Sequence, residues 1–385
     1  MKVIVTDASQ RTALYVIRSL GRRGIDVTAV EKEVGRWTNL GFSSKYVEKS
    51  AVLPSVHDEP DLYLEELLKI CRGHDVLFPI SMYSLKVVSR HIDEFRKILH
   101  VPVVNYEKLI KANNTETLIN IANNAGVPTP KTYFIKDLNQ VKEIAEDLNY
   151  PVFIKVKEEL DLDPAKRNMM VSSVKELLEK YVELHRFQPF PLIQEYIKGE
   201  GQGYFAIFNR QSEPKVVFGH RRIREYPITG GPSAFCESHY NSKAMECGDR
   251  LLRALDWYGL AMVEFKVDER DQLPKLMEIN PRVWGSMPLA IASGVDFPYL
   301  LSKLAIDGDV QELRSFKEGV KVRFLINDIR AALSYLAKGK RKIAYLRKFI
   351  KDLFDMNVRE GILSFSDPKP GLVNITKAIR RLFQG

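Results

Sequence analysis

The chain has few cysteines and no long apolar run. Only three of its 385 residues are cysteine, and Cys71, Cys236 and Cys247 lack the C-x-x-C spacing of zinc and redox sites. This usage argues against a disulfide framework and for a reducing compartment, so we expect a cytoplasmic protein. Apolar runs such as 288–292 are too short to span a bilayer. No apolar or Arg-rich leader follows Met1, which agrees with that expectation.

The first turn of the chain lacks glycine. Residues 2–6 are predicted as a strand and residues 11–20 as a helix, and no glycine lies between them. The G-x-G-x-x-G fingerprint is therefore absent, which excludes a nicotinamide dehydrogenase. Strands and helices go on alternating through one helix predicted over 81–99 and a strand over 101–104. This alternation predicts a parallel, Rossmann-like sheet.

Positive charge is in excess and is partly local. The net charge is +9, and basic residues gather in the last fifth of the chain, at 338–342, 347–351 and 380–381. Such a tail could meet nucleic acid, an acidic polymer or an anionic membrane. A solvated helix face is the favoured interpretation. Nucleic acid is not expected, because few aromatic residues interleave with the cations for base stacking.

Two acids on neighbouring predicted strands are the most informative feature. Residues 261–267 and 275–280 alternate apolar and polar residues around a polar connection, which predicts a hairpin carrying Glu264, Glu278 and Asn280 on one face. Two carboxylates ~4 Å apart repel by about 4 kcal/mol at an effective dielectric near 20, so a cation between them is expected. Oxygen ligands of this kind suit Mg²⁺. The alternative is that both acids are simply solvated.

These residues, followed by the run Asn280-Pro281-Arg282-Val283-Trp284-Gly285, resemble the ATP-grasp superfamily and its carboxylate–amine ligases. D-alanine–D-alanine ligase, biotin carboxylase and the ATP domains of carbamoyl phosphate synthetase are members. The similarity covers about residues 1–308 and implies an α/β and α+β fold. The implied parts are a Rossmann-like N-terminal domain over 1–105, ATP-grasp subdomain A over 106–190, subdomain B over 191–308 and a basic C-terminal extension over 309–385.

The resemblance implies a role for each matching residue. The implied activity is ATP-dependent ligation of a small-molecule carboxylate to an amine through an acyl phosphate, and members are often homodimers. The implied cofactors are ATP and Mg²⁺, with Mn²⁺ as an alternative metal. The implied site comprises metal ligands Glu264, Glu278 and Asn280; phosphate-binding Lys155; hinge residues Gln194, Glu195 and Ile197 at the adenine; Glu200 at the ribose; Arg282 at the transferred phosphoryl group; and Arg224, in the basic segment 221–226, at the acyl phosphate or carboxylate.

Two departures from the family pattern stand out. Thr115 takes the place of a lysine before the Gly-x-Pro-x-Pro segment, and Lys111 is the candidate substitute. The flap over residues 158–167 contains no glycine, leaving Lys166 and Arg167 as candidates to reach the phosphates. These departures keep open a nucleotide-binding protein without turnover, in a regulatory or scaffold role. His220 is expected to be a surface histidine at a strand end.

Overall fold

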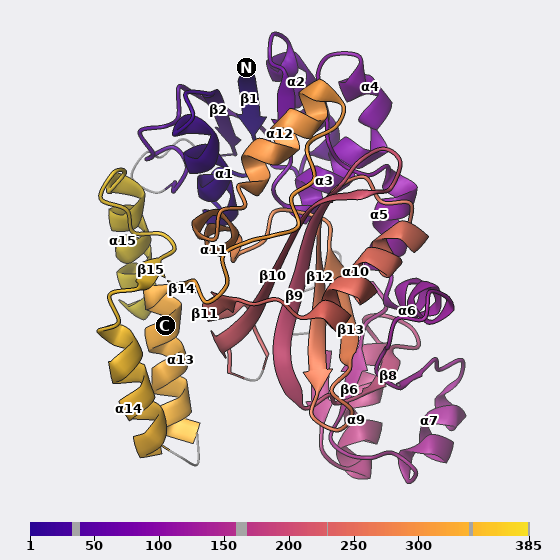
Figure 1. The fold of residues 1–385 in the computed structure, drawn as a ribbon. Coiled ribbons are helices and arrows are strands. Elements are labelled where there is room, and N and C mark those ends of the chain that lie inside the picture. The colour runs from indigo at the N-terminus through magenta and orange to yellow at the C-terminus, as the bar shows by residue number, and fades with distance from the viewer. Residues whose placement is uncertain (33–38, 159–167, 229, 339–341, 384–385) are drawn as a thin grey trace.

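A computed structural model describes residues 1–32, 39–158, 168–228, 230–338 and 342–383 (Figure 1). The N-terminal part is a parallel four-stranded sheet in the order β3-β2-β1-β4 with helices on both faces. The parallel sheet expected from the sequence is present. Its elements are β1 Lys2–Val5, α1 Arg11–Gly21, β2 Asp26–Glu31, β3 Lys49–Val52, α2 Pro60–Cys71, β4 Val76–Phe78, α3 Met82–Arg90 and α4 Ile92–Arg96.

The predictions for one long helix and one strand were wrong in detail. The helix predicted over 81–99 breaks at His91 into α3 and α4, and residues 101–104 form no strand. A further break lies at Asn114, between the helices over 106–113 and 115–124, where the backbone is extended (φ −93°, ψ 113°). The Asn114 side chain accepts a hydrogen bond from the backbone N–H of Thr117 at 2.9 Å. This N-cap starts a new helix and explains the break.

A small antiparallel sheet in the order β5-β8-β6-β7 follows. It has its own core of apolar side chains between the sheet and the helices α7 and α9. The elements of this part are α5 Tyr106–Asn113, α6 Thr115–Asn124, β5 Thr132–Tyr133, α7 Leu138–Ala145, β6 Val152–Lys155, β7 Asn168–Val171, α9 Val174–His185 and β8 Leu192–Glu195.

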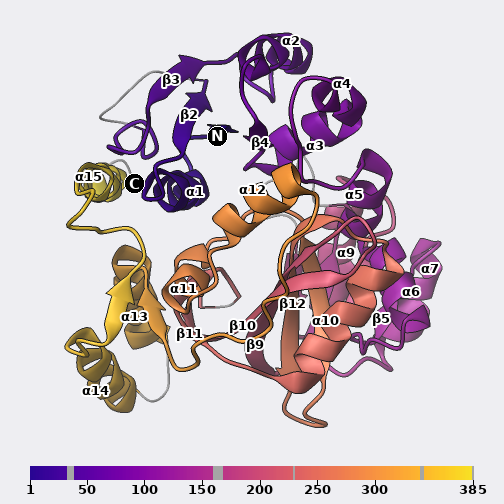
Figure 2. The same ribbon diagram turned by 45° about the horizontal axis from the view of Figure 1, so that its top comes forward.

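The largest sheet has seven strands in the order β13-β12-β9-β10-β11-β14-β15. Helix α10 covers one face, and α11, α12 and the N-terminal sheet lie on the other (Figure 2). Its elements are β9 Gly199–Phe208, β10 Pro214–Glu225, β11 Ser233–Ser238, α10 Ser242–Ala254, β12 Gly259–Asp268, β13 Pro274–Asn280, α11 Met287–Ala292, α12 Phe297–Asp307, β14 Lys321–Arg323, α13 Leu325–Lys338, α14 Lys342–Leu353, β15 Val358–Glu360 and α15 Lys369–Phe383.

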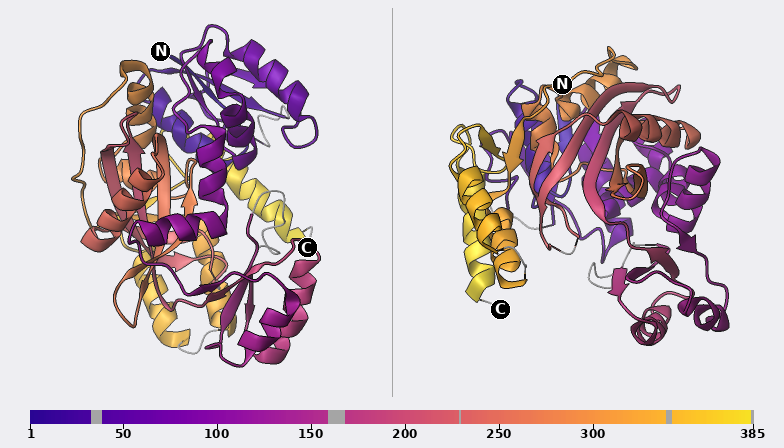
Figure 3. Two further views of the ribbon diagram at one scale, coloured as in Figure 1. Left: turned by 90° about the vertical axis from the view of Figure 1, so that its right-hand side faces the viewer. Right: turned by 60° about the horizontal axis from the view of Figure 1, so that its bottom comes forward.

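The predicted C-terminal extension is partly built into this sheet. Strand β14 pairs with β11, and β15 pairs with β14, so residues beyond 308 complete one edge. The C-terminal helices and the small sheet lie on opposite sides of the large sheet (Figure 3). None of the helices in the described ranges is long and apolar enough to cross a bilayer.

A buried ion pair joins the two ends of the chain. Arg18 on α1 donates to Asp367 at 2.9 Å, and the two side chains are 7% and 2% exposed. Arg18 also donates to the carbonyls of Ile362 and Asp367, at 2.6 and 2.8 Å. Asp367 further accepts a hydrogen bond from the Ser44 hydroxyl at 2.8 Å. The carboxylate and guanidinium are thus hydrogen-bonded on several sides, as buried charges require.

We expect Arg18→Gln to lower the free energy of unfolding by about 3–5 kcal/mol, because it leaves Asp367 buried with no cation. Urea denaturation of the full chain measures this loss. Arg23→Gln is the matched control, because Arg23 pairs with Asp296 at 2.9 Å but is 45% exposed. An exposed pair contributes at most about 1 kcal/mol, so similar losses in both variants would contradict the prediction.

Candidate functional site

The three candidate metal ligands lie together on the hairpin of β12 and β13. Glu264 is directly opposite Glu278 in the register, and Met262 is opposite Asn280. The Asn280 amide donates to Glu264 at 3.2 Å and to Glu278 at 2.7 Å. A half turn of this amide exchanges its nitrogen for its oxygen, which would complete a set of three oxygen ligands. The expected alternation of side chains thus gathers these groups on one face.

Glu264 is largely buried. Its side chain is 17% exposed. Burial raises the pKa of Glu264 to about 7, and Glu278 adds to the rise, while Arg222 and Arg282 act in the opposite direction. Burial and the competing charges thus leave the pKa of this carboxyl group close to neutral pH. An added cation at this face would therefore favour the charged form of Glu264.

Arg222 is the cation nearest to Glu264. Its guanidinium forms a short ion pair with Glu264 and donates to the carbonyl of Gly231 at 3.2 Å. Its Nε is buried and has no acceptor among the described residues. Glycine is required at position 231, since a Cβ would lie 2.4 Å from the carbonyl oxygen of Tyr226. The turn of Gly230 and Gly231 and the basic segment 221–226 therefore meet at Arg222, for which no individual role was predicted from the sequence.

Arg282 approaches the same carboxylate from the end of β13. It is half-buried and donates to the carbonyl of Val283 at 3.2 Å. Its charge lowers the pKa of Glu264. Two guanidinium groups and two carboxylates therefore share one face of the sheet. This donor set fits Mg²⁺, because its hard oxygens are already close together and Glu264 is a buried acid.

The predicted hinge lies beside the same strand. Ile197 is 3% exposed, and its carbonyl accepts from the ammonium of Lys266 at 3.4 Å. Lys266 is two residues from Glu264 on β12 and so shares its face. The Gln194 side chain donates to Thr132 at 2.9 Å. The contact from Lys266, which the sequence did not single out, links the hinge to the strand of Glu264.

The side chain of Glu195 serves the structure at this hinge. It accepts from the backbone N–H of Lys131 at 2.8 Å and from Arg270 at 3.0 Å. The backbone N–H of Glu195 also donates, to the carbonyl of Lys131 at 2.9 Å, so this N–H and the carboxylate are both engaged within the protein.

Lys155 ends β6, opposite Asn168 and Leu192, and is half-buried. Within the described ranges it has no carboxylate partner, whereas Lys157 pairs with Glu116 at 2.9 Å. Of the two neighbouring lysines, Lys155 is thus the one left for an added anion. The flap that follows, with Lys166 and Arg167, falls among residues 159–167 and lies outside the described residues.

The predicted substitute for the missing lysine is engaged elsewhere. Lys111 pairs with Glu107 one turn away at 2.6 Å. Thr115 begins α6, and its backbone N–H donates to the carbonyl of Lys157 at 2.9 Å. The structure thus offers no sign that Lys111 takes over the lysine's place.

Glu200 is not brought together with the metal candidates. Glu264 lies opposite Gly203 on β9, and directly opposed residues share a face. Glu200 is three residues from Gly203 on β9, so its side chain points to the other face. There it accepts a hydrogen bond from Gln202 at 2.9 Å. There it lines a separate cavity of about 470 Å³ together with Asn241. A ribose contact for Glu200 has no support in this geometry.

Arg224 is likewise held away from Glu264. Its guanidinium binds Asp328 at 2.6 and 2.9 Å and Asp352 at 2.5 Å. The ring of Phe235 lies 4.5 Å from its Cζ. A register shift between Arg222 and Arg224 breaks the alternation that would have placed both on one face. The predicted catalytic role of Arg224 is thus replaced by a structural one, anchoring α13 and α14.

The expectation of a surface histidine was wrong. His220 is 1% exposed, and its ring centroid lies 4.7 Å from that of Phe205. Burial, followed by the charge of Arg222, lowers the pKa of His220 well below its usual value. Neither ring nitrogen has a partner among the described residues, and the same holds for the indole N–H of Trp284. Both rings pack against Phe205, within apolar packing from distant elements.

Comparison with known proteins identifies the fold. The biotin carboxylase domain dimer of Hydrogenobacter thermophilus 2-oxoglutarate carboxylase, in complex with MgADP, ADP and bicarbonate, has a TM-score of 0.65 at 16% identity, over 83% of this chain and 73% of that one. The L-amino acid ligase of Bacillus licheniformis has a TM-score of 0.62 at 15% identity, over 80% and 75%. The chain has the ATP-grasp fold. The fold implied by the resemblance is thereby confirmed.

Sequence comparisons agree with this ATP-grasp assignment. A family model described as ATP-grasp in the biosynthetic pathway with Ter operon matches residues 217–327. The carbamoyl phosphate synthase large chain of Pyrococcus furiosus is 23% identical over 256 residues. That match takes in 63% of this chain and 23% of the relative, so the chain spans about a quarter of the length of that protein.

We expect Arg224→Gln to act on stability. The loss should be about 2–3 kcal/mol in the free energy of unfolding, because hydrogen bonds to two charged partners are lost while Asp328 keeps Arg323 at 3.1 Å. Arg221→Gln on the same strand is the control. Arg221 is 41% exposed and pairs with Glu237, so a loss of at most about 1 kcal/mol is expected. Equal urea midpoints for the two variants would refute the anchoring role.

Proposed function

We propose that this chain is an ATP-dependent ligase that joins a small-molecule carboxylate to an amine. One observation carries the proposal: Glu264, Glu278 and Asn280 converge on one face of the hairpin, with Arg222 and Arg282 beside them. A metal-bound polyphosphate contains a cation and an anion. Two acids suit the metal, and two arginines suit the phosphates. The likeness of the fold to an L-amino acid ligase supports a carbon–nitrogen bond as the product.

The proposed roles follow from the contacts. Glu264, Glu278 and Asn280 would hold Mg²⁺, which when bound neutralises charge on the phosphates. Arg222 and Arg282 stabilise the transferred phosphoryl group, because each presents a planar fork of donors to oxygen anions. Lys155 binds the phosphates from the small sheet. The hinge at Gln194, Glu195 and Ile197 holds the adenine. The roles of Lys155 and the hinge are proposed from the resemblance to the ATP-grasp superfamily. A homodimer is proposed on the same basis.

The proposed reaction has two steps. An oxygen of the substrate carboxylate attacks the γ-phosphorus of ATP, the bond to ADP breaks, and an acyl phosphate forms. The amine nitrogen then attacks the acyl carbon, inorganic phosphate leaves with the electron pair of its bond, and the nitrogen loses a proton. Catalysis in this scheme depends on positioning and on cations facing the phosphoryl group, so no activated nucleophile of the protein is needed.

A second candidate is a nucleotide-binding protein without turnover. It is favoured by Lys111, which pairs with Glu107 and so does not replace the lysine missing at Thr115. Phosphate release from Mg-ATP, measured with pools of carboxylates and amines, distinguishes the two. The ligase requires release that depends on both an acid and an amine. Thermal stabilisation by Mg-ATP with no release from any pool would establish the second candidate.

Replacing Glu278 tests the metal ligands directly. We expect Glu278→Gln to weaken Mn²⁺ binding in the presence of ADP by roughly tenfold or more, since a full negative charge beside the cation is removed. Electron paramagnetic resonance of free Mn²⁺ measures the affinity without any turnover. Glu269→Gln is the control, because Glu269 lies on the connection of the hairpin and pairs with Lys198 at 2.7 Å. Equal affinities in both variants would remove Glu278 from the site.

Arg222 and Arg221 form a matched pair on β10. Arg222 faces Glu264, whereas Arg221 pairs with Glu237 on the other face. We expect Arg222→Gln to reduce acid-dependent phosphate release by roughly 100-fold or more, as found when a donor to a developing negative charge is lost. Arg221→Gln should stay within about twofold, as is usual for an exposed ion pair. Equal rates for the two variants would show that the face of the strand does not matter.

A further inference from the structure

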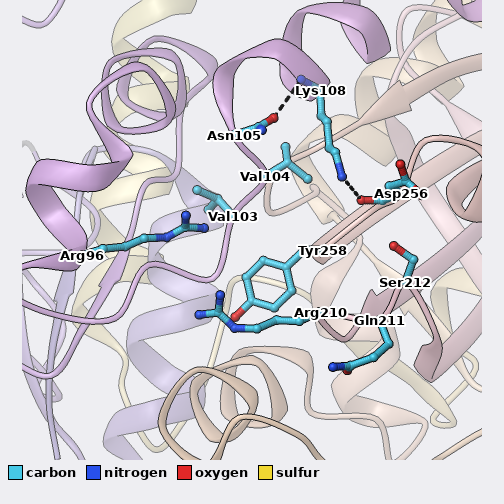
Figure 4. Close-up of a pocket in the computed structure, with 10 residues that line it drawn as sticks. All are labelled: Arg96, Val103, Val104, Asn105, Lys108, Arg210, Gln211, Ser212, Asp256 and Tyr258. Atoms are coloured by element: carbon cyan, nitrogen blue, oxygen red, sulfur yellow. Dashed lines mark hydrogen bonds between the residues drawn. The ribbon is translucent and has the colours of Figure 1, made fainter.

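A separate cavity of about 400 Å³ lies where the N-terminal part meets the large sheet (Figure 4). It contains none of the residues assigned above to the nucleotide or the metal. Its volume falls within the range of about 300–1,000 Å³ that is typical of small-molecule sites. The lining residues come from four separate segments: Arg96; Val103, Val104, Asn105 and Lys108; Arg210, Gln211 and Ser212; Asp256 and Tyr258.

Positive charge converges on this cavity from both parts of the molecule. Arg96 on α4 and Arg210 on the turn between β9 and β10 point toward one another beside Tyr258 (Figure 4). The Arg210 Cζ lies 5.1 Å from the centre of the Tyr258 ring. Burial raises the pKa of Tyr258, and the charges of Arg210 and Arg96 both act to lower it. The Arg210 guanidinium therefore lies against the Tyr258 ring, and the charge of Arg96 also acts on the hydroxyl.

These cations have little compensation from the protein. Arg96 approaches Asp93 only at 3.9 Å, and that carboxylate is 90% exposed. For Arg210, the described part of the chain holds no carboxylate within ion-pair distance. Lys108 donates to the backbone carbonyl of Asp256 at 2.5 Å. It likewise has no carboxylate within ion-pair distance among the described residues. Three cations against one acid, Asp256, give the lining a positive balance.

The walls of the cavity are held in place by unusual backbone. Ser212 and Asp256 both have left-handed conformations, with φ of +57° and +47°. Gly259, which directly follows Tyr258, has φ +85°, and a Cβ there would lie 2.3 Å from the carbonyl oxygen of Pro102. The two parts of the molecule are thus in close contact at this point. Positions of this kind persist where the surrounding structure holds them, as they do at binding sites.

We infer that this cavity is a second binding site, which takes the phosphate group of a small phosphorylated molecule. Arginine forks bind phosphate oxygens in pairs, and a tyrosine hydroxyl with the polar side chains of Asn105, Gln211 and Ser212 can complete the contacts. One water takes up ~30 Å³ in the liquid, so a cavity of about 400 Å³ is several times larger than a single oxyanion. The ligand therefore carries more than its phosphate group. Tyr258 lies six residues from Glu264, or about 20 Å along an extended strand.

Calorimetric titration of the full chain with inorganic phosphate and with glycerol 3-phosphate tests this site. We expect saturable binding, tighter for the phosphomonoester, that falls at least roughly tenfold in Arg210→Gln and in Arg96→Gln, as expected for losing hydrogen bonds to a charged group. Arg72→Gln is the control, because it removes one charge from an exposed position of the N-terminal part. It should change the affinity by less than about twofold, as surface charges do.

Three outcomes would overturn the inference. One is the absence of saturable binding. Another is an equal loss in Arg210→Gln and Arg72→Gln, which would mean that phosphate responds only to net charge. The third is binding that survives Arg210→Gln but is lost in Arg222→Gln, because phosphate would then occupy the site at Glu264. Thermal melting of each variant verifies that the fold is intact, which we expect because Arg210 and Arg72 are exposed.

Discussion

Repulsion between two facing carboxylates is the constraint on which the arrangement of this molecule depends. Glu264 and Glu278 stand opposite each other on adjacent strands, where like charges destabilise a sheet. Asn280, Arg222 and Arg282 offset this repulsion from three directions. The neighbouring strand β9 makes room for them, since a Cβ at Gly201 would lie 3.1 Å from the Cδ of Arg222. Gly201 on β9 and the turn of Gly230 and Gly231 are understandable from the need to bring Arg222 to this pair.

The hairpin could be predicted from sequence because its geometry is local. Side chains alternate with a period of two, and a short polar connection fixes which residues face each other. Glu264, Glu278 and Asn280 therefore fell on one face, as expected. The break at Asn114 was also readable in principle, because asparagine is a strong N-cap and an acid follows in the next turn. The alternation of strands and helices along the sequence was likewise enough to predict the parallel N-terminal sheet.

The roles of Arg222 and Arg224 could not be separated in this way. Both lie on one basic segment, two residues apart, and regular alternation would give them the same face. A register shift separates them, and the partners of Arg224 are 104 and 128 residues away in the chain. His220 is buried for the same reason, since packing from distant strands and helices covers it. Contacts of such sequence separation leave no local pattern to read.

The ion pair between Arg18 and Asp367 has a consequence for how the chain is made. These residues are 349 positions apart, so α1 leaves the ribosome long before its partner does. Until then a cation destined for burial has no acid, and the edge of the large sheet still lacks β14 and β15. At about 5–20 residues per second, synthesis of that interval takes tens of seconds or more. Between the synthesis of β11 (Ser233–Ser238) and that of β14 (Lys321–Arg323) the nascent chain exposes an unpaired strand edge, which makes this interval a period of exposure to misfolding and to chaperones.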